Sequence, residues 1–83
     1  MSFRHMFKWL FRRSRPTISK TEAISIARDE CEKRKWTWRE PVKVQPGWGI
    51  WIVHTNWGYR GANARIAIDQ ETGEVTEAVY LPR

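Results

Sequence analysis

The chain has little of what a disulfide-bonded or metal-binding protein needs. Of its 83 residues, one is a cysteine, Cys31, and two are histidines, His5 and His54. A lone cysteine excludes an intramolecular disulfide framework, and two distant histidines without a cysteine cluster do not match the ligand spacing of a zinc site. An uninterrupted apolar run of about 20 residues, the length that spans a bilayer, is also missing. We therefore expect no bound metal, no transmembrane helix, no signal peptide and a cytoplasmic location.

Catalytic patterns are missing as well. Asp69, Glu71 and Glu74 gather near one predicted turn, but acids at such positions usually serve the turn itself, and a calcium loop needs more oxygen ligands at regular spacing. The glycines between residues 47 and 61 match no phosphate-binding motif, because none leads from a strand into a helix at the required spacing. The sequence therefore predicts that the protein is not an enzyme and that it has no cofactor and no small-molecule substrate.

The distribution of charged residues divides the chain into two parts. The length allows one domain with a thin core, since a chain of this size buries only about 60% of its unfolded surface. Residues 1–15 hold five Lys or Arg and no acid, whereas residues 16–83 hold ten Lys or Arg against nine Asp or Glu, so most of the formal charge of +6 lies at the start. Pro16 disfavours helix at the residue before it. We predict a basic N-terminal arm, residues 1–15, and a nearly neutral domain, residues 17–83.

The arm has the pattern of a short amphipathic helix. Its apolar residues recur at helical spacing from Phe3 to Phe11, and its cations lie on another face. Three interpretations remain open: the helix packs on the sheet of its own domain or of a second copy, it lies in an anionic membrane interface, or it binds nucleic acid. Under the last two, the residues that contact the membrane or polyanion are Phe7, Lys8, Phe11, Arg12 and Arg13.

The clearest local signal lies just after the arm. Ser19 stands three residues before Glu22, which predicts a capping box and a helix that begins near Lys20. Ala23, Ile24, Ala27 and Cys31 then form an apolar stripe at helical spacing, and the cations of residues 33–35 mark the helix end. Cys31 on this stripe is expected to behave as a small buried hydrophobe.

Strand patterns fill the rest of the chain. Residues 36–44 predict a first strand, in which Pro41 requires an edge position or a bulge, and residues 50–55 predict an apolar central strand. A glycine-rich aromatic loop follows at residues 56–63. Apolar alternation into and out of a turn at Gly73 predicts a closing hairpin. The fold class is thus α+β: one main helix on a three- to four-stranded antiparallel sheet, in the order α-β-β-β-β, preceded by a short amphipathic N-terminal helix.

Two motifs in this order resemble those of PepSY-like domains: the capped helix opening at residues 18–23, and a hairpin turn with Asp69, Thr72, Gly73, Glu74 and Val75. The resemblance covers about residues 17–82 and implies a helix across a short antiparallel sheet. It also implies a non-enzymatic role, because PepSY domains accompany peptidases as propeptide or regulatory modules or belong to cell-envelope proteins. From the sequence we expect two departures from that pattern, namely no attached peptidase domain and no export signal.

The six tryptophans are more than one thin core hides easily. The central strand is apolar on both faces, and one helix covers only one of them, so the arm, a second copy of the chain or a partner protein is expected on the other. Trp, Tyr and Arg are the residues that most often anchor protein interfaces. The predicted recognition surface therefore consists of Trp51, Trp57, Tyr59 and Arg60.

These observations favour a small protein-binding module, an inhibitor or immunity-like factor that acts through the aromatic sheet face and the loop. One alternative is a small nucleic-acid binder, in which sheet aromatics stack on unpaired bases while Arg60, Arg65 and the arm engage phosphates. Nucleic acid is the less favoured partner, because the domain itself is close to neutral. Another alternative is a peripheral membrane protein held by its arm. A homodimer is compatible with each of these functions.

Overall fold

The computed structural model describes residues 17–82. The amphipathic helix predicted for residues 1–15 lies outside this range, as do the residues predicted to contact a membrane or polyanion, which are Phe7, Lys8, Phe11, Arg12 and Arg13. The domain that follows the arm is therefore the part whose structure can be compared with the sequence patterns.

The main helix, α2, spans Lys20–Arg34, as the capping box predicted. The Ser19 hydroxyl accepts a hydrogen bond from the Glu22 backbone N–H at 3.1 Å, and a Glu22 carboxylate oxygen accepts one from the Ser19 N–H at 2.8 Å. Each side chain thus satisfies a donor that the first helical turn leaves unpaired. The helix ends where Lys35 adopts a left-handed conformation, a geometry that often closes helices.

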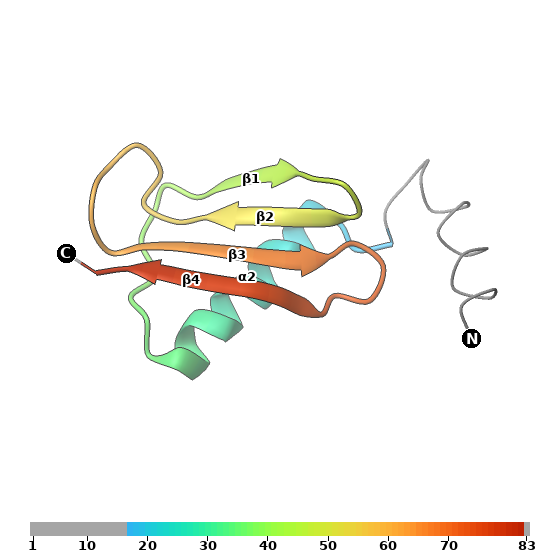
Figure 1. Ribbon diagram of the computed structural model, residues 1–83, viewed down its shortest axis with the longest axis horizontal. Coiled ribbons are helices and arrows are strands. Elements are labelled where there is room, and N and C mark those ends of the chain that lie inside the picture. The colour runs from blue at the N-terminus through green and yellow to red at the C-terminus, as the bar shows by residue number, and fades with distance from the viewer. Residues whose placement is uncertain (1–16, 83) are drawn as a thin grey trace.

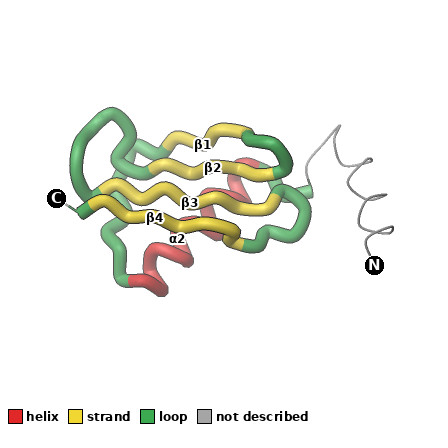
Figure 2. The backbone as a smooth tube through the Cα atoms, in the orientation of Figure 1, coloured by secondary structure: helices red, strands yellow, loops and turns green. Residues whose placement is uncertain are grey.

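Four strands form one antiparallel sheet: β1 (Lys43–Pro46), β2 (Ile50–His54), β3 (Asn63–Asp69) and β4 (Val75–Leu81). They lie in sequence order, so every strand pairs with its neighbour in the chain. Helix α2 crosses one face, which lies behind the sheet in Figure 1, and Figure 2 shows the four strands side by side in front of it. The predicted α+β architecture, one helix on a four-stranded antiparallel sheet, is confirmed.

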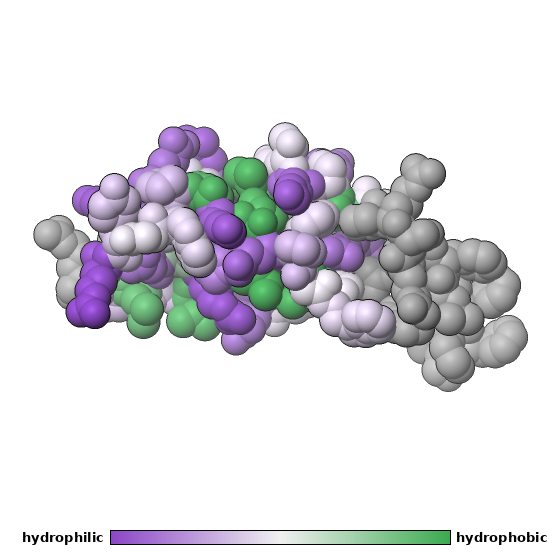
Figure 3. Space-filling model, turned by 90° about the horizontal axis from the view of Figure 1, so that it is seen from above, coloured by the Kyte–Doolittle hydropathy of each residue, from purple (hydrophilic) through white to green (hydrophobic). Residues whose placement is uncertain are grey.

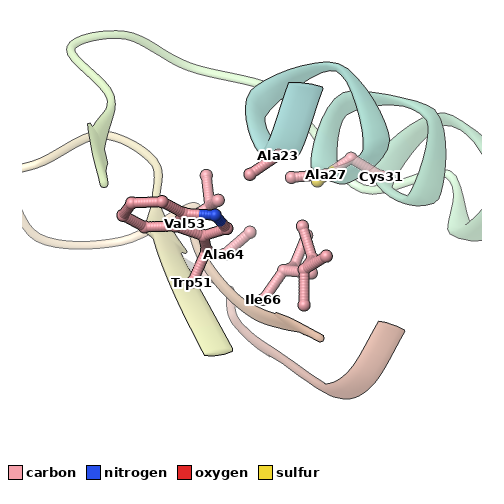
Figure 4. Close-up of a cluster of buried hydrophobic side chains, with 8 residues drawn as sticks. Ala23, Ala27, Cys31, Trp51, Val53, Ala64 and Ile66 are labelled. Carbon is pink, nitrogen blue, oxygen red and sulfur yellow. The ribbon is translucent and has the colours of Figure 1, made fainter. Parts of the chain in front are cut away.

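Small residues bring the helix close to the sheet. Ala23, Ala27 and Cys31 of α2 are fully buried against Val53 and Ile66 of the central strands, and Figure 4 shows these side chains converging between the two layers. Burial raises the pKa of the Cys31 thiol, because the thiolate would lose its hydration there. Cys31 therefore stays protonated and packs as a small apolar residue, as its position on the stripe indicated.

The closing hairpin is built by its turn residues. The Asp69 carboxylate accepts hydrogen bonds from the backbone N–H groups of Glu71 at 2.7 Å and Thr72 at 3.0 Å. Gly73 has φ of 81°, the left-handed conformation expected of it. Between Ala67 and Ile68 the pairing with β4 shifts register, so the hairpin carries an irregularity that the alternating pattern did not reveal.

The first strand differs from the prediction for residues 36–44, since β1 begins only at Lys43. Pro41 has no N–H to donate to a sheet ladder, and the segment before β1 pairs with the loop after β2 instead. The Arg39 carbonyl accepts from the Asn56 N–H at 2.8 Å, and the Pro41 carbonyl accepts from the Trp57 N–H at 2.9 Å. The backbone groups that the prediction assigned to a strand therefore hold this loop in place.

No helix within residues 17–82 has the length and apolar character needed to cross a bilayer.

Candidate functional site

The site lies on the face of the sheet opposite α2, which we call the open face and toward which Figure 1 looks. Strand alternation and register assign to it His54 of β2, Arg65 of β3 and Val79 of β4, which are cross-strand neighbours in one row. Lys43 of β1 extends the same row, because it pairs with His54. Within the described part of the chain, helix packing is confined to the other face.

The segment between β2 and β3, residues 56–62, forms what we call the aromatic loop. Its first residue, Asn56, is buried at φ of 52°, and its side-chain amide donates a hydrogen bond to the Gly61 carbonyl at 2.8 Å. Ala62 at the other end also adopts a left-handed φ, of 54°. Such conformations cost non-glycine residues about 1–3 kcal/mol each and persist only where the surroundings enforce them. The loop is thus held in one shape at both ends.

Asn63 reinforces this shape from the start of β3. Its side-chain NH₂ group lies within hydrogen-bonding distance of three carbonyl oxygens, those of Thr55 at 3.1 Å, Asn56 at 3.0 Å and Tyr59 at 3.1 Å. The buried Thr55 hydroxyl accepts from the Ala64 N–H at 2.8 Å, directly beside it. One side chain therefore ties the loop's beginning and its tip to the sheet.

Between the aromatic loop and the ends of β3 and β4 lies a cavity of about 320 Å³, which we call the loop groove. Its lining includes Trp57 and Tyr59 from the loop and Val79 and Leu81 from β4. These four side chains are 43%, 67%, 41% and 61% exposed, and they gather around one cavity, so they form a contiguous apolar patch. The groove can receive one apolar or aromatic group between an aromatic wall and an aliphatic wall.

Two cations lie near the groove. The Lys43 ammonium lies 5.3 Å from the centre of the Trp57 ring, and the His54 ring contacts the same indole at 5.0 Å between centroids. Arg65 lines the groove and reaches Glu77 at 3.4 Å, with both side chains about half exposed. An exposed ion pair of this kind is weak, so the Arg65 guanidinium keeps most of its capacity for another anion.

His54 sits between these cations. Burial lowers the pKa of its imidazole, and the charges of Arg65 and Lys43 lower this pKa further. Its Nε2 lies 3.0 Å from the Gln45 side-chain carbonyl oxygen, which can only accept, so Nε2 carries the proton of the neutral ring. His54 is therefore a neutral support for Trp57 at physiological pH.

The four residues predicted for the recognition surface lie in two different places in the structure. Trp57, Tyr59 and Arg60 lie together on the aromatic loop and are exposed. Trp51 does not join them, because its side chain points toward α2, is 7% exposed, and donates a hydrogen bond from Nε1 to the Ile18 carbonyl at 2.7 Å. The inclusion of Trp51 in a recognition surface was wrong, since the helix covers that face of β2.

Sequence reasoning missed the opposite wall of the groove. The apolar alternation predicted Val79 and Leu81 on the half-buried face together with Val75, and Lys43 was given no role. That placement was wrong, because the register shift leaves Val75 on the core and turns Val79 and Leu81 to the open face. The signal that could have found them was the apolar alternation of β4, which places these two side chains on one face. That signal could not show that the face is the one that α2 leaves uncovered.

Metal chemistry finds no support in residues 17–82, where no three His, Cys, Asp or Glu side chains gather closely enough to hold an ion. The groove offers apolar surface, two aromatic rings and cations, which suits binding of an apolar group with negative charge nearby.

No protein-family model, no curated protein and no solved structure matches this chain. The resemblance to PepSY-like domains therefore rests on the sequence motifs alone.

Proposed function

We propose that this protein is a non-enzymatic protein-binding module whose loop groove receives an apolar side chain of its partner. The observation that carries the proposal is the aromatic loop, which holds Trp57 and Tyr59 exposed opposite Val79 and Leu81. Two left-handed non-glycine residues, Asn56 and Ala62, lie at the two ends of the loop that presents these rings.

The energetics suit binding. Burying a Val or Leu side chain fully is worth about 1.5–3 kcal/mol, and Trp, Tyr and Arg most often supply the largest contributions at interfaces. Ordering a flexible side chain costs about 0.5–1.5 kcal/mol on association. Because His54 and Lys43 already contact the Trp57 ring in the free protein, part of this cost is absent. A preformed apolar groove of this kind supports affinity despite its small area.

The inhibitory or immunity-like role suggested by the sequence belongs to the same proposal, as does a cytoplasmic location. A module that acts by covering a partner surface needs shape and anchoring side chains, both of which the loop groove supplies.

The test is selection of a random peptide display library on the full chain, followed by affinity measurement for the enriched peptides. We expect the double substitution Trp57→Ala with Tyr59→Ala to weaken those peptides about 10-fold or more, since loss of one interface anchor typically costs above 1 kcal/mol. Trp48→Ala is the matched control, because Trp48 is an exposed tryptophan in the turn between β1 and β2. It should leave the affinity unchanged.

Two outcomes would overturn the proposal. In one, no enriched peptide depends on Trp57 and Tyr59. In the other, single-stranded oligonucleotides bind with a steep salt dependence that the same double substitution abolishes, which makes the groove a nucleic-acid site.

A further inference from the structure

We infer that the partner segment is acidic: it places one apolar side chain in the loop groove and sets carboxylates beside it against Lys43 and Arg65. This inference rests on the proposed protein-binding function and specifies the chemistry of the partner.

The charge around the groove is local and does not follow from the composition of the domain. Residues 17–82 contain nine Lys or Arg and nine Asp or Glu, so the described domain is formally neutral. At the groove, however, Arg65 in the lining and Lys43 over the Trp57 ring stand against Glu77, while Arg39 and Glu40 are adjacent in sequence and offset each other. The domain's charges are therefore sorted by position, with a cationic excess at one end of the open face.

The order of the strands and helix explains why most acidic side chains lie away from the groove. Asp69 ends β3, and Glu71 and Glu74 lie in the turn that follows it; Figure 1 shows this turn at the end of the two strands opposite the aromatic loop. Seven residues of β3 separate the two ends, which corresponds to about 20 Å of extended chain and about two screening lengths at physiological salt. Four further acids lie on α2, across the sheet: Glu22, Asp29, Glu30 and Glu32. Glu30 there is already engaged by Arg34 and Lys33.

The groove's own geometry separates an anchor position from a charge position. Val79 and Leu81 form the aliphatic wall, while the Arg65 side chain, 46% exposed, lies in the row next to Val79. The Lys43 ammonium is directed over the Trp57 ring at the opposite rim. An apolar side chain seated between the walls thus lies beside Arg65, with Lys43 across the Trp57 ring. Carboxylates flanking that side chain in the partner's sequence would meet these cations.

Charge also bears on three other possible occupants of the groove: the N-terminal arm, a second copy of the chain and single-stranded nucleic acid. The arm carries five cations and no acid in residues 1–15, so it would be repelled from this rim. A second copy would bring the same cations to a symmetric contact. Single-stranded nucleic acid needs a continuous cationic track with rings free on one face for stacking. Here Lys43 and Arg65 are two separate cations and form no continuous track, and one wall of the groove is aliphatic.

The test uses two matched peptide libraries and the full chain. Both have a central Leu, Phe or Trp; one has Asp or Glu at the two positions on each side, and the other has Lys or Arg there. We expect the acidic library to bind about 10-fold or more tightly than the basic one. The double substitution Lys43→Glu with Arg65→Glu should reverse this preference.

Lys20→Glu with Arg28→Glu is the matched control, because it makes the same change in charge on α2, across the sheet from the groove. It should leave the acidic preference in place. If the double reversal at the groove disturbs folding, as circular dichroism would show, Lys43→Gln and Arg65→Gln provide the test separately. Each should reduce the acidic preference about 3-fold.

Equal affinity for both libraries, still dependent on Trp57 and Tyr59, would overturn the acidic partner and leave the protein-binding function standing. Loss of the acidic preference in the α2 control would also overturn it, because the effect would then come from net charge. Absence of any groove-dependent peptide binding would instead refute the proposed function itself.

Discussion

Two tryptophans that pack against the same core have opposite hydrogen-bonding situations. The Nε1 of Trp51 donates to the Ile18 carbonyl at 2.7 Å and so ties the start of α2 to the sheet. The Nε1 of Trp38 is buried without an acceptor among the described residues. A buried donor without a partner costs desolvation free energy that nothing returns, whereas a satisfied one contributes about 1 kcal/mol. The two indoles therefore contribute differently to stability although both bury large rings.

This difference predicts the result of one matched pair of substitutions. Trp51→Phe should lower the free energy of unfolding by about 1 kcal/mol or more beyond Trp38→Phe, because it leaves the Ile18 carbonyl without its donor. Both substitutions remove the same number of atoms, so the loss of volume largely cancels. Urea unfolding followed by circular dichroism measures the comparison. Equal losses would show that ring volume, and not the hydrogen bond, sets the contribution of Trp51.

At the scale of elements, two segments are shaped by single side chains. Ser19 closes the first turn of α2 through the capping box, and Asn63 joins three carbonyls around the aromatic loop. The consequences of losing them differ, because α2 is also packed on the core, whereas the loop's tip holds exposed side chains. The loop therefore depends on its side-chain hydrogen bonds more than the helix does.

We predict that Ser19→Ala lowers the free energy of unfolding by about 1 kcal/mol and leaves the aromatic loop intact. Asn63→Ala should have at least as large an effect on stability, and it should also speed hydrogen exchange at the loop amides of residues 56–62, since three carbonyls lose their donor. Residue-resolved hydrogen exchange separates the two. Unchanged loop exchange in Asn63→Ala would mean that the left-handed residues alone hold the loop.

At the scale of the whole molecule, α2 and the sheet share one core within residues 17–82. Its buried members run from Ala23 to Ile68, and the residues packed around them run from Ile18 to Tyr80. The open face, by contrast, is partly apolar and partly basic. Figure 3, seen from the side of β1, shows hydrophilic and hydrophobic side chains interspersed along that edge. Lys43 and Pro46 on the short strand β1 are features that discourage pairing with another sheet edge.

A chain that begins at Thr17 should therefore unfold cooperatively in urea and remain a monomer by light scattering, as should the full chain. Its formal charge falls from +6 to +1, so retention on heparin should be lost while peptide binding at the loop groove persists. A dimer of either chain at micromolar concentration would contradict this, and Arg65→Glu would then show whether the groove lies in the dimer contact.

Local chemistry was sufficient to predict α2 and the β3–β4 turn. The capping box at Ser19 and the turn at Asp69 are decided by hydrogen bonds that reach three residues or fewer along the chain. The first strand was overextended because residues 39–41 pair with the loop after β2, a contact between segments more than 15 residues apart that no local pattern contains.

The site, however, was decided only by the tertiary structure. Alternation in β2 showed two apolar faces, with Trp51 on one and His54 on the other, but it could not show which face the helix covers. The small residues of α2 pack against Val53 and Ile66, so the helix covers the face of β2 that carries Trp51 and buries this side chain. Register then placed Val79 and Arg65 beside the aromatic loop. Helix α2 and the β3–β4 turn follow from hydrogen bonds between residues close in sequence. The loop groove depends on contacts between segments that are far apart in the chain.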